Sequence, residues 1–235
     1  MGGLGKKGEV TMYHEIPDKN FLSNMKELCF CMMNELKMSI YNNTPLEVKM
    51  NLVGSGAKNL FLQNAKEPID LDFNVNIIGW EESVNIGKNA REIKEYIRKE
   101  FNRVLKKFGL DDCQDSTSAL TTNLIHFTKG NKTEFSIDLA IVYEDDYGRW
   151  NRLIHEKTGS VAYDRWYWNE IPNSNDLIKK VDKIKKHNLW TKVMPIYKEK
   201  KNMYLGIPDE KENHPSFNVY IETINEIYYK YFKGA

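Results

Sequence analysis

The sequence predicts an α+β fold, in which a mixed sheet is flanked by helices and followed by a mainly helical C-terminal lobe. Two segments alternate apolar and polar side chains, as strands with one buried face do, and two others repeat apolar side chains at helical spacing. The strands are expected at residues 69–77 and 133–142, and the helices at residues 18–41 and 89–108. With 235 residues, the chain is long enough for two lobes, which we expect to span residues 1–150 and 151–235.

The strand at residues 69–77 carries apolar side chains at its odd positions and polar ones at its even positions. Asp70 and Asp72 begin the polar face, and the ~3.3 Å rise per residue keeps them close to each other. Because two fixed carboxylates repel each other, we expect a divalent cation between them. Mg²⁺ suits oxygen ligands and leaves coordination places open for substrate phosphates.

A small-residue turn, Gly54-Ser55-Gly56, follows a short predicted strand at residues 50–53. We expect this turn to open a helix over about residues 57–64. Glycine lets the backbone approach a ligand closely, and N–H groups at the start of a helix attract anions. Gly54 and Ser55 are therefore candidates for binding a phosphate beside the acidic strand.

The predicted strand at residues 133–142 places Ser136 and Asp138 on its polar face. If this strand lies beside the first acidic strand, Asp138 comes within one strand spacing, ~4.8 Å, of the Asp70 and Asp72 pair. A further strand is expected at residues 117–128, joined to it by a hairpin-like turn that fixes the register. Three carboxylates would then converge at one edge of the sheet.

These segments resemble the motifs of the polymerase-β-like nucleotidyltransferase superfamily. The resemblance rests on Gly54-Ser55, Asp70-Leu71-Asp72 and Phe135-Ser136-Ile137-Asp138, in that order, within residues 52–142. It is nearest to the branch of oligoadenylate synthases, cyclic GMP–AMP synthase and bacterial cyclic-oligonucleotide synthases. One departure from the family pattern is the connection from Ser55 to Asp70, which is longer than usual.

The resemblance implies a fold, a reaction and a set of site residues. Residues 1–150 would form the polymerase-β-like catalytic lobe, with a long N-terminal helix. The reaction would transfer a nucleoside monophosphate from a nucleoside triphosphate, such as ATP, to an acceptor hydroxyl, with release of pyrophosphate. Asp70, Asp72 and Asp138 would be the catalytic residues and would hold two Mg²⁺ ions, or Mn²⁺, while Gly54 and Ser55 bind the nucleotide. The product could be a cyclic or a linear oligonucleotide. The acceptor stays open between a nucleotide, a small molecule, RNA and a protein.

Two other classes of function stay open. One is a catalytically silent nucleotide-binding or signalling module with the same fold. The other is a nucleic-acid-binding protein that uses the lysine-rich segment at residues 179–186 together with aromatic side chains, although a formal net charge of +1 argues against an extended basic surface. Asp111 and Asp112 follow the end of a predicted helix, so we interpret them as solvated turn residues rather than metal ligands.

Composition bears on the cellular compartment. The three cysteines lack metal-site spacing, which favours reduced thiols in a cytoplasmic protein. No apolar run reaches membrane-spanning length, so we expect no membrane partner. Residues 1–7 have no apolar signal core and are expected to form a flexible tail.

Overall fold

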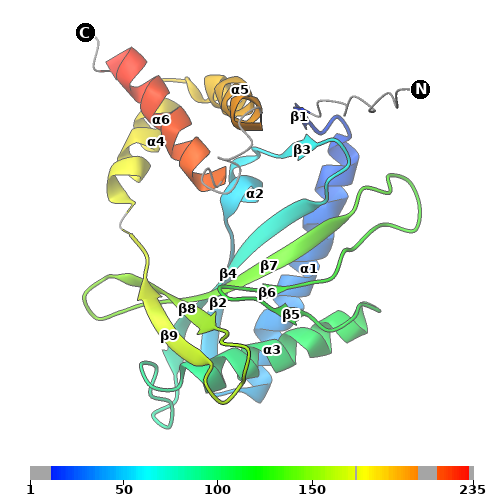
Figure 1. Cartoon of the computed structure of the whole chain (residues 1–235), viewed down its shortest axis with the longest axis vertical. Helices are drawn as coiled ribbons and strands as arrows, with labels where there is room; N and C mark the ends of the chain where they lie inside the picture. The colour runs from blue at the N-terminus through cyan, green and yellow to red at the C-terminus, as the bar shows by residue number, and fades with distance from the viewer. Residues whose placement is uncertain (1–11, 173, 206–215, 233–235) are drawn as a thin grey trace, which may run out of the picture. The chain divides into compact units, whose positions relative to one another are not determined.

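The structure, a computed structural model, describes residues 12–172, 174–205 and 216–232 (Figure 1). It contains two compact units. The sheet unit comprises residues 17–61 and 68–172, and the described parts of the helical unit are residues 12–16, 62–67 and those from 174 onward. The predicted N-terminal tail lies outside the described residues. Among the described helices, none combines the length and the apolar character needed to cross a membrane.

The sheet unit is built on a seven-stranded mixed sheet. Its strands are β2 (Leu46–Leu52), β4 (Ile69–Trp80), β5 (Gln114–Asp115), β6 (Leu120–Thr121), β7 (Phe135–Glu144), β8 (Trp150–Glu156) and β9 (Arg165–Glu170). The main path runs β2-β4-β7-β6-β5, and β8 pairs with the other part of β7 and with β9. Only β4 and β7 are parallel; the other pairs are antiparallel. The predicted α+β class and mixed sheet are confirmed.

Two long helices cover the apolar face of the sheet. They are α1 (Lys19–Asn43) and α3 (Ala90–Lys107), which pack against each other. Asp18 caps α1, because its side chain accepts a hydrogen bond from the backbone N–H of Phe21 at 2.9 Å. Phe30 of α1 meets Phe73 of β4 edge to face, with ring centroids 5.6 Å apart. The polar face of β4 and β7 is therefore the face turned away from this core.

The predicted helix at residues 57–64 is wrong. The helix after the small-residue turn is α2 (Gly54–Lys58), which begins at the turn itself and has five residues. It ends because Asn59 takes a left-handed conformation, with φ of 55°. The chain then forms β3 (Leu62–Asn64), so the long connection noted in the sequence contains a strand.

The predicted strand at residues 117–128 is also wrong in its extent. Only Leu120 and Thr121 form a strand, β6, and Ile125 makes one isolated bridge to Phe135. Leu120 is buried and Leu124 is half exposed, so these two residues do not share a buried face. The strands β8 and β9, which extend the sheet beyond residue 150, were not predicted from the sequence. The division into lobes at residue 150 stays a prediction.

The helical unit contains four helices and two short strands within its described residues. Its helices are α4 (Asn175–Lys186), the 3₁₀ turn η1 (Trp190–Lys192), α5 (Val193–Leu205) and α6 (Ser216–Phe232), and its strands are β1 (Tyr13–Glu15) and β3. Lys180 and Lys183 of α4 lie over aromatic rings of α6, at 5.3–5.7 Å from the ring centre of Tyr228. Part of the lysine-rich face therefore lies against aromatic rings of the protein itself, although Lys183 also remains exposed.

Candidate active site

The two acidic strands lie side by side in the register that the motifs require. β4 and β7 are parallel neighbours, and Asp72 is directly opposite Asp138. Asp70 is opposite Ser136, one residue pair further along the same face. Because neighbouring strands are about 4.8 Å apart, carboxylates in this register share one small region of the sheet. The structure thus brings together all three predicted acidic residues.

Two of the three carboxylates accept short hydrogen bonds from hydroxyl groups. Ser136 Oγ donates to Oδ1 of Asp70 at 2.5 Å, and Thr121 Oγ1 donates to Oδ1 of Asp138 at 2.6 Å. Hydrogen bonds to a carboxylate are short and strong, and they restrict its rotation. The backbone of β4 therefore sets where Asp70 lies, and neighbouring strands set how the carboxylates are turned.

Electrostatic repulsion in this cluster is not fully relieved. Burial, together with the negative charges of Asp138 and Asp70, raises the pKa of Asp72 to about 6. Burial also raises the pKa of Asp138; the hydrogen bond from Thr121 lowers it in part, and the charge of Asp70 raises it further. Such shifts arise when like charges are held close together in a partly desolvated place. A bound cation would offset the effects of burial and of the neighbouring charges, because it favours the ionised carboxylates.

Two basic side chains lie close enough to act on Asp72. The charges of Lys58 in α2 and Arg152 in β8 both favour its ionised form, but they do not outweigh burial and the neighbouring carboxylates. Lys58 Nζ donates to the carbonyl of Gly54 at 2.8 Å. Nε of Arg152 is buried and has no hydrogen-bond partner within the described residues. The site therefore contains cations as well as carboxylates.

Gly54 lies against Asp72. Its φ of +62° is in the left-handed region, and a β-carbon at this position would be 2.1 Å from Oδ2 of Asp72. The backbone N–H of Val53 also donates to the carbonyl of Asp72 at 2.8 Å. Only glycine suits both the conformation and the space. The predicted turn and the predicted acidic strand are thus in direct contact, with Ser55 as the next residue of α2.

The described side chains do not form a finished metal cage. Within residues 12–172, 174–205 and 216–232, no group of three or more His, Cys, Asp or Glu side chains is placed to hold a metal ion. The donor set nevertheless fits a divalent cation, because three clustered carboxylates supply oxygen ligands and a negative charge that raises the pKa of Asp72.

Several polar residues of this site were not predicted from the sequence. They are Thr121, Lys58 and Arg152, whereas Ser136 was predicted on the correct face but without a role. Ser136 could have been found, because it is two residues from Asp138 and therefore shares its face. The other three reach the site from α2, β6 and β8, which no periodic pattern connects with the acidic strands.

Comparisons with known proteins support the fold. No protein-family model matches the sequence, and no curated protein sequence matches it either. Solved structures do match. CdnC of Escherichia coli MS115-1, solved with ATP, superposes with a TM-score of 0.57 at 16% identity, over 88% of this chain and 61% of that chain.

Two further structures agree. The CdnE cyclic dinucleotide synthase of Elizabethkingia meningoseptica, solved with GTP and Apcpp, gives a TM-score of 0.52 at 11% identity over 92% of this chain and 78% of its own. The cyclic AMP-GMP synthase DncV of Vibrio cholerae, described as a prokaryotic cGAS homologue, gives 0.51 at 8% identity over 78% of this chain and 60% of that one.

The chain thus has the fold of these solved proteins, which confirms the resemblance inferred from its motifs at the level of the fold. It spans about three fifths of the length of CdnC. At these low identities the comparison concerns the arrangement of the chain, while the chemistry depends on the site residues.

Proposed function

We propose that the chain is a metal-dependent nucleotidyltransferase, which moves a nucleoside monophosphate from a nucleoside triphosphate to an acceptor hydroxyl and releases pyrophosphate. The observation that carries this proposal is the register of β4 and β7, which puts Asp72 opposite Asp138 and Asp70 on the same face. The raised pKa of Asp72 and the fold shared with cyclic dinucleotide synthases support it.

Asp70, Asp72 and Asp138 are the residues that would hold the metal. When bound, two Mg²⁺ ions would polarise the phosphates and lower the pKa of the acceptor hydroxyl. Mn²⁺ would serve the same purpose. Because Asp72 interacts with the other two carboxylates, it is central to the cluster and should ionise fully when the cation binds.

The protein side chains then divide the remaining tasks. Gly54 and Ser55 bind the triphosphate, ATP being one candidate, and hold it against the acidic strand. Asp138 accepts the proton of the acceptor hydroxyl, whose oxygen attacks the α-phosphorus in line. The bond between the α-phosphorus and its bridging oxygen breaks, and pyrophosphate leaves with the electron pair. The acceptor itself, and whether the product is a cyclic or a linear oligonucleotide, are outcomes for experiment.

We also propose a cytoplasmic location. Cys29, Cys31 and Cys113 are all free in the structure, and two of them are buried. Free thiols in this number are typical of proteins in a reducing compartment.

The test is to incubate the chain with labelled nucleoside triphosphates and Mg²⁺ or Mn²⁺, and to resolve the products by mass. We expect pyrophosphate together with a new phosphodiester or phosphate ester. Asp72→Asn and Asp138→Asn should each lower the rate on the order of 10³-fold or more, since metal assistance is worth several kcal/mol. Asp112→Asn, on the exposed turn, is the matched control and should keep the full rate.

Three results would change the assignment. Metal-dependent nucleotide binding in calorimetry without any product would identify a silent nucleotide-binding module. Full turnover in Asp72→Asn would remove the acidic cluster from the reaction. Polynucleotide binding that falls steeply with salt and does not respond to the Asp variants would instead favour the nucleic-acid-binding class.

A further inference from the structure

Thr121 links Asp138 to a part of the sheet unit that lies outside the acidic cluster. Its hydroxyl donates to Oδ1 of Asp138 at 2.6 Å and lies 3.2 Å from Oγ of Ser116. A threonine hydroxyl has one proton, so with that proton on Asp138 the bond to Ser116 must be donated by the serine. The proton order is therefore Ser116 to Thr121 to Asp138.

This chain of hydroxyls leaves one oxygen of Asp138 available. Oδ1 is taken by Thr121, and no described residue donates a hydrogen bond to Oδ2. A carboxylate held by one oxygen presents the other in a defined direction. That is the arrangement expected of a carboxylate that must meet a cation or an acceptor proton in a fixed geometry.

The strand that carries Thr121 is too short to hold itself in place. β6 has two residues, Leu120 and Thr121, which pair with β7 on one side and with the two-residue strand β5 on the other. The preceding segment is fixed from outside the strand, because Lys94 of α3 donates to the carbonyl of Ser116 at 2.8 Å. The backbone N–H of His155 in β8 also donates to the carbonyl of Thr117 at 2.7 Å. Two neighbouring elements thus hold the segment that leads to Thr121.

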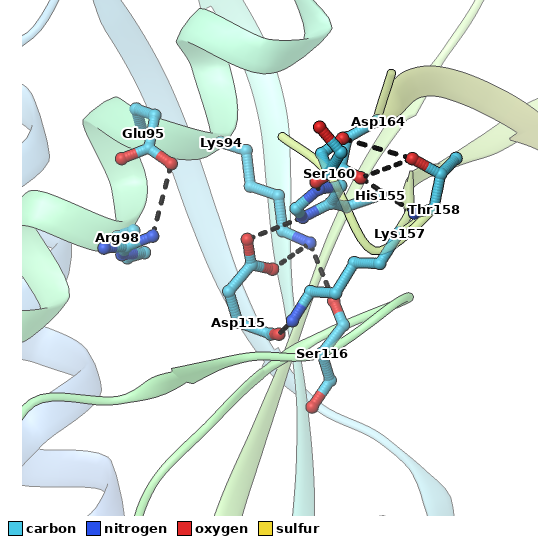
Figure 2. A network of polar contacts seen from close by, with 10 residues as sticks. All are labelled: Lys94, Glu95, Arg98, Asp115, Ser116, His155, Lys157, Thr158, Ser160 and Asp164. Atoms are coloured by element: carbon cyan, nitrogen blue, oxygen red, sulfur yellow. Dashed lines mark hydrogen bonds and ion pairs between the residues drawn. The ribbon is translucent and has the colours of Figure 1, made fainter. Parts of the chain in front are cut away.

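Figure 2 shows the buried network of side chains that surrounds the segment leading to Thr121. Lys94 Nζ lies 2.5 Å from Oδ1 of Asp115, and the side chain of Lys94 is 1% exposed. His155 places Nδ1 at 2.7 Å from Oδ2 of Asp115 and Nε2 at 3.0 Å from Oδ2 of Asp164. The imidazole of His155 thus joins the two carboxylates, and Lys94 and His155 hold Asp115 from two sides.

We propose that Thr121 is a positioning residue for Asp138, and that the buried network of Lys94, Asp115, His155 and Asp164 holds Thr121 in place through Ser116. This inference deepens the proposed function and rests on it. Thr121 touches neither substrate nor metal in this scheme; it acts by fixing the direction of Oδ2 of Asp138.

The central test compares Thr121→Val with Thr121→Ser. Valine keeps the shape and loses the donor, whereas serine keeps the donor. Partners of metal-binding carboxylates typically contribute about 10–100-fold to metal affinity or activity. We expect Thr121→Val to lose about that factor in kcat at an unchanged KM for the nucleotide, and Thr121→Ser to recover most of it.

A second readout does not need turnover. Free Mn²⁺, followed by its paramagnetic resonance signal in the presence of a non-hydrolysable nucleotide, gives the metal affinity of each variant. We expect weaker Mn²⁺ binding in Thr121→Val, near-normal binding in Thr121→Ser and a smaller loss in Ser116→Ala. The smaller substitution at Ser116 keeps the test usable if Thr121→Val does not fold.

Thr122→Val is the structural control. Thr122 is buried, and its Oγ1 accepts a hydrogen bond from the N–H of Ile137 at 2.9 Å, so its loss should lower the melting temperature. Its effect on Mn²⁺ affinity should nevertheless be smaller than that of Thr121→Val. If Thr122→Val weakens Mn²⁺ binding as much as Thr121→Val does, the role of Thr121 is only structural and the inference is overturned.

The outcomes separate this inference from the proposed function. If the unchanged protein binds Mn²⁺ but shows no turnover, the transferase proposal is overturned. The difference in Mn²⁺ affinity between Thr121→Val and Thr121→Ser would still test the positioning role. Normal turnover and Mn²⁺ affinity in Thr121→Val would overturn the inference and leave the transferase intact. Equal losses in the valine and serine variants would overturn it too, because the donor would not matter.

Discussion

Two groups of acidic side chains in the sheet unit differ in what neutralises them. In the buried network (Figure 2), Asp115 and Asp164 each face a cation or an imidazole. Burial alone would raise the pKa of Asp115, but Lys94 and His155 outweigh it and hold that pKa below its usual value. In the acidic cluster the balance is reversed, because burial and two like charges raise the pKa of Asp72 to about 6.

The difference separates a structural role from a candidate functional one. A buried carboxylate whose charge is matched by protein cations holds elements together and needs nothing further. A buried carboxylate whose charge is left unmatched reduces stability unless a ligand supplies the missing positive charge. The predictions that follow test this contrast, beginning with the largest expected change in stability.

The largest change is expected for Asp115→Asn. This substitution keeps the shape of the side chain but leaves the ammonium of Lys94 buried without its charge partner. Breaking a buried ion pair from one side typically costs about 3–5 kcal/mol. We expect the free energy of unfolding in urea to fall by this amount at pH 7.

The free energy of unfolding at low pH tests whether the charge of Asp115 is the cause of this loss. Because the folded pKa of Asp115 is depressed, its contribution is present above the unfolded pKa and is lost as pH falls through the folded value. The variant should therefore approach the unchanged protein at low pH. A loss of the same size at every pH would point to packing rather than charge.

Asp72→Asn should change stability in the opposite direction. The folded pKa of Asp72, about 6, lies above the ordinary value of 3.8, so its favourable contribution is complete at low pH and is lost as pH rises through about 6. At about 1.4 kcal/mol per pKa unit, removing this charge should stabilise the metal-free protein by at most about 3 kcal/mol at pH 7.

Urea unfolding at pH 4 and pH 7 measures this gain. We expect little difference at pH 4 and a more stable variant at pH 7, together with the loss of turnover described above. Adding Mg²⁺ and a nucleotide should stabilise the unchanged protein and leave the variant less affected. A variant that is less stable at pH 7 would show that Asp72 is held by favourable contacts, contrary to this interpretation.

The acidic cluster was open to prediction from the sequence because it depends on local rules. Asp70 and Asp72 are two residues apart in a strand with strict alternation, and Asp138 occupies the polar face of a second alternating strand. The contact between Gly54 and Asp72 followed from their motifs, although the helix after the turn is shorter than predicted and ends at Asn59. The alternation of apolar and polar residues and the order of the motifs were sufficient to predict the acidic cluster and the turn beside it.

The buried network was not open to prediction, because long-range packing forms it. His155 is 40 residues from Asp115 in the sequence, and no pattern connects them. β8 was missed for a related reason: its inward positions are occupied by Leu153 and by a polar residue, His155, which hides the alternation. In β9 the run Trp166-Tyr167-Trp168 is aromatic on both faces, so the period of two is equally hidden.

The smallest effect is expected for Asp112→Asn, which removes an acidic side chain that is neither buried nor clustered. Asp112 pairs with Lys106 at 3.1 Å, and their side chains are 54% and 68% exposed. Exposed ion pairs are typically worth about 1 kcal/mol or less, because water screens both charges. We expect the free energy of unfolding to change by no more than this, and we expect unchanged Mn²⁺ binding and turnover.

The difference in the free energy of unfolding between Asp112→Asn and the unchanged protein should be smaller at 1 M salt than at 0.1 M salt, since salt screens exposed charges. A large loss of activity in Asp112→Asn would show that acidic residues outside β4 and β7 take part in the reaction, and it would remove the distinction between matched and unmatched carboxylates as a guide to the site.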